Sequence, residues 1–127
     1  MNLSNIDKAF IDEVEELSGV NPYACYQCGK CSAGCPFSDI MDQLPSQVIR
    51  RVQLGDTSVL ESETIWICAS CLSCQVTCPK GIDLANLMEG LREINLRRNR
   101  DNLDINRLVV EDLPQIALVS NLRKKTS

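Results

Sequence analysis

Hydrophobic residues recur along the chain at the spacing of helices, and no stretch alternates convincingly with the period of a strand. Residues 5–18 form the first helical pattern, which ends at Gly19. Its apolar face carries Ile6, Phe10, Val14 and Leu17. A second pattern begins at Pro45, which suits the first turn of a helix, and it ends at Gly55. Both segments are predicted to be amphipathic helices.

Two further helices are expected in the second half of the chain. Asp83 is a good N-cap residue, and the helix that follows it should reach about Arg98. Its apolar face carries Leu84, Leu87, Met88, Leu91 and Ile94. The tail over residues 108–122 is also expected to be helical, with a break or a new start near Pro114. The sequence therefore predicts an all-α fold.

The apolar side chains alone predict only a modest hydrophobic core. The chain has 127 residues, which is about the length of one domain, and only 4% of its residues are aromatic. Eight cysteines are therefore candidates to help hold the fold together. The chain opens on an acidic helix and not on a signal sequence, and no run approaches the ~20 apolar residues of a membrane span. We expect a cytoplasmic protein without membrane insertion.

Charge is distributed unevenly along the chain. The net charge of −4 argues against nucleic-acid binding. Residues 1–24 hold five acidic residues against Lys8, whereas eight of the thirteen basic residues lie between Arg92 and Lys125. The basic segment could form a docking face for a partner, or it could be a solvated helix face, and both interpretations remain open.

All eight cysteines belong to two copies of one motif, C-x₂-C-x₂-C-x₃-C-P. The copies begin at Cys25 and Cys68, 43 residues apart, and their last cysteines precede Pro36 and Pro79. The first copy consists of Cys25, Cys28, Cys31 and Cys35, and the second of Cys68, Cys71, Cys74 and Cys78. The sequence therefore contains an internal duplication of a cysteine site.

Three kinds of site compete for these cysteines. A disulfide framework would require an oxidising compartment, which nothing in the sequence suggests. A Cys₄ zinc site uses C-x₂-C half-sites, but it normally combines two neighbouring cysteines with two more from elsewhere. A 4Fe–4S cluster binds one thiolate at each of four irons, and a tight loop can supply three of them at positions i, i+3 and i+6. The spacing therefore favours two 4Fe–4S clusters.

The fourth ligand of each cluster is expected to come from the other copy of the motif. In two-cluster proteins with this motif, the cysteine before proline binds the cluster of the other loop. Cluster 1 is thus predicted to be bound by Cys25, Cys28, Cys31 and Cys78. Cluster 2 is predicted to be bound by Cys68, Cys71, Cys74 and Cys35. This crossing would place the two clusters close enough together to exchange electrons.

Residues beside the motif each allow two interpretations. Trp66 precedes the second loop and is expected either in the core, as an ordinary buried tryptophan, or over a cluster as a shield from solvent. Lys30 and Lys80 lie beside cysteines and could offset the negative charge of a cluster or could be solvated. The chain has no histidine and no glycine-rich phosphate loop, so no catalytic residue is identified. We expect it to move electrons without transforming a substrate by itself.

Two such loops separated by helices resemble the α-helical ferredoxin domain. The stretches "LPSQVIRRVQLG", "IWICASCLSCQVTCP" and "IDLANLMEGLRE" are similar to the C subunit of heterodisulfide reductase, and the resemblance covers roughly residues 20–98. Related domains occur in the iron–sulfur subunits of succinate dehydrogenase, fumarate reductase and anaerobic glycerol-3-phosphate dehydrogenase. The resemblance implies an electron-transfer subunit with two 4Fe–4S clusters.

The resemblance also implies protein partners. The C subunit of that family relays electrons between a flavin-bearing protein, which is the A subunit, and a disulfide-cleaving protein, which is the B subunit. Partners that resemble these two proteins are therefore expected. The chain would then consist of an N-terminal helical extension (1–22), the two-cluster domain (23–98) and a partly helical C-terminal extension (99–127). A freely diffusing two-cluster ferredoxin and a Cys₄ zinc interaction module are the alternatives, and the two extensions favour a subunit over a free carrier.

Overall fold

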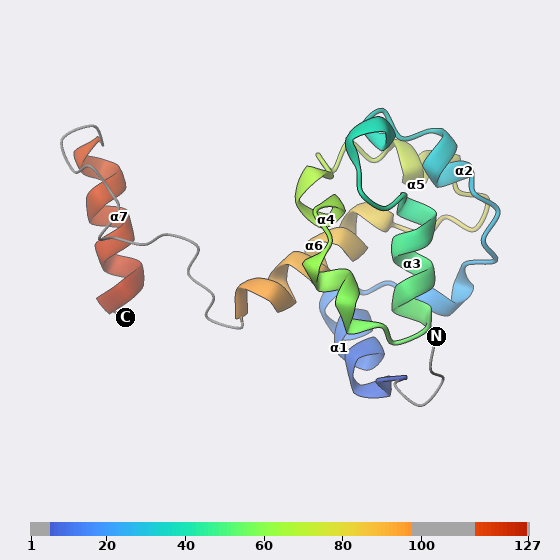
Figure 1. Ribbon diagram of the computed structural model, residues 1–127, viewed down its shortest axis with the longest axis horizontal. Coiled ribbons are helices and arrows are strands. Elements are labelled where there is room, and N and C mark those ends of the chain that lie inside the picture. The colour runs from blue at the N-terminus through green and yellow to red at the C-terminus, as the bar shows by residue number, and fades with distance from the viewer. Residues whose placement is uncertain (1–5, 98–113, 127) are drawn as a thin grey trace.

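The computed structural model describes residues 6–97 and 114–126, and within these ranges the chain is helical without any strand (Figure 1). The predicted all-α fold is therefore confirmed. The elements of the first range, with η marking short 3₁₀ turns, are α1 (Lys8–Ser18), η2 (Pro22–Ala24), α2 (Lys30–Ala33), η3 (Ser38–Ile40), α3 (Pro45–Gln53), η4 (Thr57–Glu61), α4 (Thr64–Ile67), α5 (Ser73–Thr77) and α6 (Leu84–Arg97). The second range contains α7 (Gln115–Thr126).

Helix α1 occupies most of the first predicted segment. The Asp7 carboxylate caps its start by accepting a hydrogen bond from the N–H of Phe10 at 3.2 Å, and Gly19 ends it in a left-handed conformation with φ of 67°. Because the helix begins only after Asp7, Ile6 lies before it with 49% of its surface exposed. The buried face of α1 instead includes Ile11, so the prediction was wrong for Ile6.

Helix α3 begins at Pro45, as predicted, and the chain turns at Gly55, whose φ is 64°. A β-carbon added to Gly55 would lie 2.7 Å from the backbone nitrogen of Asp7, so only glycine fits at this point. The N–H of Asp7 donates a hydrogen bond to the Gly55 carbonyl at 3.4 Å. The start of α1 is therefore held directly against the end of α3.

The hydrophobic core lies between α1, α3, η4 and α6. Asp83 caps the start of α6, and its carboxylate accepts a hydrogen bond from the N–H of Asn86 at 3.0 Å. All five residues predicted for the apolar face of this helix are buried. Val14 of α1 joins the same core, and Ser18 lies so near Gly90 of α6 that an added β-carbon would meet it at 3.1 Å. The boundary proposed at residue 22 stays a prediction.

Trp66 does not lie in the core. The short helix α4 turns Ile65 inward and leaves Trp66 with 48% of its surface exposed, so the interpretation of a buried core tryptophan was wrong. Helix α7 starts one residue after Pro114, as the predicted new start requires, while residues 108–113 of the predicted tail lie outside the described residues. No helix in residues 6–97 or 114–126 has the length and apolar character needed to cross a membrane.

Candidate metal centre

The two cysteine motifs fold into loops with the same backbone conformation. In the first loop Gln27 and Gly29 have positive φ angles of 62° and 79°. In the second loop the equivalent positions are Ser70 and Leu72, with φ angles of 52° and 64°. A short helix follows each pair, α2 after Gly29 and α5 after Leu72. The duplication in the sequence is therefore also a duplication of local structure.

A side chain of α3 fixes the start of the first loop. The turn η2 leads into Cys25, whose N–H donates back to the carbonyl of Pro22 at 3.3 Å. Gln53 donates through Nε2 to the carbonyl oxygens of Pro22, at 2.7 Å, and of Cys25, at 2.9 Å. This amide therefore binds the exposed carbonyl end of η2 and orients the first cysteine.

A side chain of α6 fixes the start of the second loop in the same way. The short helix α4 leads into Cys68, whose N–H donates to the carbonyl of Thr64 at 3.0 Å. Arg92 donates through Nε to the carbonyl of Ile65 and through a terminal nitrogen to that of Cys68. These two carbonyls occupy the same motif positions as those bound by Gln53. Each loop is thus held by an equivalent side chain, which we call its clamp. The clamp is the neutral amide of Gln53 in the first loop and the guanidinium of Arg92 in the second.

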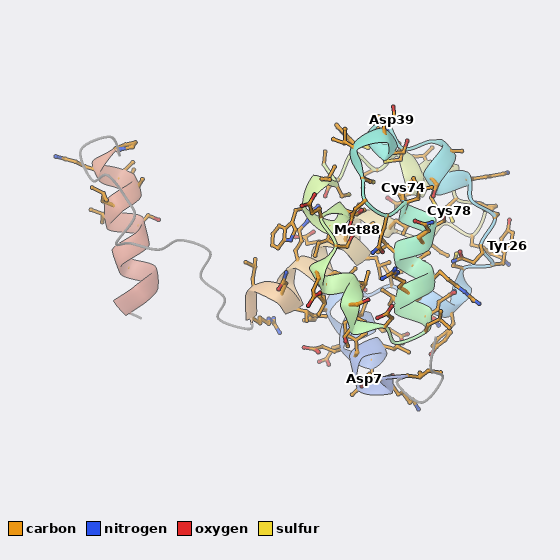
Figure 2. The ribbon with its side chains drawn as sticks, in the orientation of Figure 1. Asp7, Tyr26, Asp39, Cys74, Cys78 and Met88 are labelled. Atoms are coloured by element: carbon orange, nitrogen blue, oxygen red, sulfur yellow. The ribbon has the colours of Figure 1, made fainter. Side chains whose placement is uncertain are left out.

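The four cysteines predicted for cluster 2 line one cavity that opens to solvent. Three of them come from the second loop, whereas Cys35 comes from the end of the first. Most of the remaining lining is apolar and includes Phe37, Met41, Pro45, Leu84, Ala85 and Met88. Cys74 and Met88 are labelled near the middle of the helical body in Figure 2. The cavity combines four sulfur donors with walls that exclude water.

Three of the cysteines predicted for cluster 1, Cys25, Cys28 and Cys78, lie near Tyr26, which Figure 2 shows at the edge of the helical body. Loss of solvent raises the pKa of the Tyr26 hydroxyl, and the neighbouring Cys28, Cys78 and Cys25 raise it further. Burial also raises the pKa of Cys31, to which the charge of Cys25 adds. Cys78 of the second loop is therefore near the cysteines of the first.

Backbone donors reach two of the cysteines around Tyr26. The N–H of Gln27 lies 3.4 Å from the sulfur of Cys25, and the N–H of Ile82 lies 3.4 Å from the sulfur of Cys78. Such N–H···S hydrogen bonds stabilise negative charge on a thiolate, and in iron–sulfur proteins they influence the reduction potential.

The two cysteine sets are closest to each other at Cys31 and Cys74. The pKa of the Cys74 thiol is raised to about 11, first by burial and then by the charges of Cys68 and Cys31. Cys31 belongs to the first loop, so its effect on the pKa of Cys74 indicates that the two cysteine sets are neighbours. Figure 1 shows the same proximity, because α2 and α5 lie together above α3. Thr77 of α5 would be only 3.5 Å from a β-carbon added to Gly34, at the end of α2.

These residues fit the binding of 4Fe–4S clusters. All eight cysteines are free thiols, and thiolates are the ligands that iron–sulfur clusters select. In the described residues, no three cysteine or acidic side chains are positioned to share a single metal ion. A four-iron cluster instead binds each thiolate at a different iron, so its ligands need not converge on one point.

The residues that support the cysteines were not predictable from local sequence patterns. Besides Gln53 and Arg92, they include Asp42, which lies between Cys35 and α3 in the sequence. The Asp42 carboxylate accepts hydrogen bonds from the hydroxyls of Ser62 and Thr64 and from the N–H of Thr64. The hydroxyl of Thr64 contributes first to lowering the Asp42 pKa, from 3.8 to about 2. This network ties the segment after Cys35 to the helix that leads into Cys68, and the polar run at 62–64 was its only trace in the sequence.

Comparison with known proteins agrees with this chemistry. Residues 22–82 match the family described as the 4Fe–4S dicluster domain. Because the match includes all eight cysteines, it implies two 4Fe–4S clusters. Both motif copies and the helices between them lie within the matched range.

Several relatives are named as subunits of heterodisulfide reductases. The C subunit of the ferredoxin:CoB-CoM heterodisulfide reductase of Methanosarcina acetivorans is 41% identical over 70 residues, which are 55% of this chain and 28% of that protein. The iron–sulfur C 2 subunit of the CoB–CoM heterodisulfide reductase of Methanocaldococcus jannaschii is 32% identical over 74% of this chain and 55% of that protein. The C2 subunit of the H(2)/formate:CoB-CoM heterodisulfide,ferredoxin reductase of Methanococcus maripaludis is 31% identical over 81% of this chain and 59% of that protein. The chain therefore spans between a quarter and three fifths of the length of these relatives.

Proposed function

Because residues 22–82 belong to the 4Fe–4S dicluster domain family and the chain is a homologue of the C subunits of heterodisulfide reductases, we propose that it relays electrons between two protein partners. The observation that carries this proposal is the proximity of the two cysteine sets. Cys31 of the first loop lies close enough to Cys74 of the second for its charge to raise the pKa of the Cys74 thiol. Two neighbouring redox centres in one small chain can take an electron on one side and release it on another.

The ligand sets that we propose are the crossed ones. Cluster 1 is bound by Cys25, Cys28, Cys31 and Cys78, and cluster 2 by Cys68, Cys71, Cys74 and Cys35. Support for cluster 2 comes from the cavity that Cys35 shares with the second loop. Support for cluster 1 comes from the position of Cys78 near Cys25 and Cys28, around Tyr26.

When bound, the clusters supply one-electron redox chemistry. The contribution of the chain is to hold them at fixed positions and to keep water away. Apolar residues such as Met88 and Leu84 close the inner side of the cavity, while Cys28 and Cys71 are the exposed cysteines of the two loops. An electron would enter and leave most directly through these exposed sides.

The crossed ligation can be tested with single-ligand variants. Anaerobically purified protein should contain about eight iron and eight sulfide per chain, because two 4Fe–4S clusters are bound. Cys78→Ser should perturb the cluster of the first loop, and Cys35→Ser should perturb that of the second. Electron paramagnetic resonance of the reduced proteins, beside their iron content, distinguishes the two. If Cys78→Ser instead damages the cluster that Cys71→Ser damages, then the fourth ligands do not cross.

We further propose that the partners are a flavoprotein and a catalytic protein that resemble the A and B subunits of heterodisulfide reductase. The support comes from the names of the relatives, which are C subunits of such enzymes. The uneven charge also supports two different partners, because an acidic N-terminal segment precedes the first loop and a basic segment follows the second. Complementary charge orients proteins and accelerates their encounter.

Anaerobic purification of the native protein, followed by identification of the chains that elute with it, tests this assignment. Two co-eluting redox proteins are expected, whereas a chain that elutes alone with both clusters would indicate a freely diffusing ferredoxin. Replacing Arg97, Arg98 and Arg100 with Glu should weaken recovery of one partner while both clusters stay assembled. Unchanged recovery of both partners would mean that these arginines are solvated and do not bind a partner.

A further inference from the structure

We propose that Arg92 is a positioning residue that also raises the reduction potential of cluster 2 through its charge. The proposal rests on the assignment of Cys68 to that cluster. Arg92 donates to the carbonyl of Cys68 itself, so its guanidinium lies within one residue of a proposed ligand. An electron added to the cluster makes this site more negative by one charge, and a nearby cation stabilises that state.

The clamp of the first loop separates the structural role of Arg92 from its charge. Gln53 binds the same two motif positions, the carbonyls of Pro22 and Cys25, with a neutral amide. Holding a loop by these carbonyls therefore requires donors but no positive charge. The charge of Arg92 is an additional property, and it is present at only one of the two equivalent clamps.

The charge of Arg92 is held in place and incompletely neutralised. The side chain is half-buried, and both of its contacts to the loop are hydrogen bonds to neutral carbonyls. Among the described residues, the ion pairs join Arg51 to Asp56 and Arg97 to Glu93, and neither involves Arg92. A guanidinium stays protonated at any pH of interest. Because it is partly withdrawn from water, salt and solvent screen its field less than that of an exposed charge.

Other cations near the loops are more exposed. Lys30 and Lys80 both lie on the surface, and the ammonium of Lys80 is 5.9 Å from the centre of the Tyr26 ring. Their charges are surrounded by water, so their effect on a cluster is largely screened. Arg92 approaches the second loop from the protein interior side, where α6 packs against α4 and α5.

The test is a redox titration of the anaerobically purified full chain, with dithionite as reductant and paramagnetic resonance as readout. The reduction wave of cluster 2 is first assigned with Cys71→Ser, because Cys71 binds this cluster whether or not the fourth ligands cross. Arg92→Gln keeps a hydrogen-bond donor and removes the charge. This substitution should lower the midpoint potential of the cluster 2 wave by ~59 mV, which corresponds to a tenfold change in the equilibrium constant of a one-electron reduction. The wave of cluster 1 should move much less.

Arg97→Gln is the matched control, because it removes the same charge from the same helix at an exposed position. It should leave both waves in place. Arg92→Lys keeps the charge and should retain most of the potential. If Arg92→Gln loads both clusters and its waves do not move, or if Arg97→Gln shifts cluster 2 equally, the proposal is wrong.

If Arg92→Gln fails to assemble cluster 2, Leu96→Glu decides the question. Leu96 is exposed one helical turn after Arg92, so a carboxylate there would partly neutralise the guanidinium without removing its hydrogen bonds. A lowered cluster 2 potential relative to Leu96→Gln supports the proposal, and an unchanged potential overturns it. Iron and sulfide contents measured in parallel separate this outcome from a failure of the proposed cluster binding, which would show as missing iron and sulfide.

Discussion

At the scale of single residues, Leu72 shows how strongly the loop geometry is imposed. A leucine in the left-handed region costs roughly 1–2 kcal/mol relative to ordinary backbone, yet Leu72 adopts a φ of 64° at the position where the first loop has Gly29. The surrounding bonds, including the Arg92 clamp on Cys68, outweigh that cost. The backbone conformation is therefore set by what the loop must hold and not by the local preference of its residues.

The equivalent glycine provides a direct test of this geometry. Gly29→Ala should destabilise the loaded protein by about 1 kcal/mol, because φ stays positive although the new β-carbon meets no atom within 4 Å. Gly34→Ala is the control, since Gly34 has a φ of −91° and ordinary contacts. Urea unfolding followed by loss of cluster absorbance measures both. Equal effects of the two substitutions would contradict the role assigned to the left-handed conformation.

A second residue-scale prediction concerns Asp42. Asp42→Asn should lower the free energy of unfolding by about 1 kcal/mol, because the charge-assisted hydrogen bonds of the exposed Asp42 carboxylate are weakened. The folded-state pKa is lowered from 3.8 to about 2, so the stabilisation is complete above the unfolded-state value and is lost only as the pH falls toward 2. The penalty should therefore be the same at pH 7 and at pH 5, where the clusters can still be followed. A penalty that already fades at pH 5 would contradict the lowered pKa.

At the scale of elements, the long helices were predictable and the short ones were not. Helices α1, α3 and α6 have enough residues to express an apolar period and to carry caps such as Asp7 and Asp83. Helix α4 has four residues, too few for a period, so nothing in the sequence indicated that Ile65 is buried and Trp66 is exposed. Tertiary packing decides the orientation of such short elements.

Helix α1 packs in the same hydrophobic core as α3 and α6, and this makes it essential to stability. Phe10→Ala should cost about 3 kcal/mol or more, because the side chain is buried among core residues and its removal leaves a cavity. Ile6→Ala, from the same segment, should have little effect, since Ile6 is about half exposed. Denaturant unfolding of both variants tests this. A small effect of Phe10→Ala would indicate that α1 is a separable extension.

At the scale of the whole molecule, the cysteine spacing predicted two crossed ligand sets, each with a fourth cysteine from the other loop. Cys35 and Cys78 each lie beside the other loop, as the crossing requires, although the ligation itself stays a prediction. The clamps were not predictable, because Gln53 and Arg92 lie far along the chain from the carbonyls they bind. Their role depends on how α3 and α6 pack, and no local pattern encodes it.

The proposed crossing makes the two clusters depend on each other. Each would join segments more than 30 residues apart, in the manner of a long-range cross-link. Loss of cluster 1 should therefore loosen Cys31 and Cys35 together and accelerate the loss of cluster 2. Iron release to a chelator should be faster from the remaining cluster of Cys78→Ser than from the intact protein. Equal rates would indicate that the two sites are mechanically independent.

The paired clamps also bear on how fast an electron can move. Transfer is slow when dipoles and backbone must rearrange around a new charge, and it is fast when they are already in place. Gln53 and Arg92 hold the carbonyls at the entrance of each loop, and the helices that carry them are anchored in the core. The atoms nearest the first cysteines thus have little freedom to respond to a change of charge. A low reorganisation energy at both centres is the consequence of that immobility.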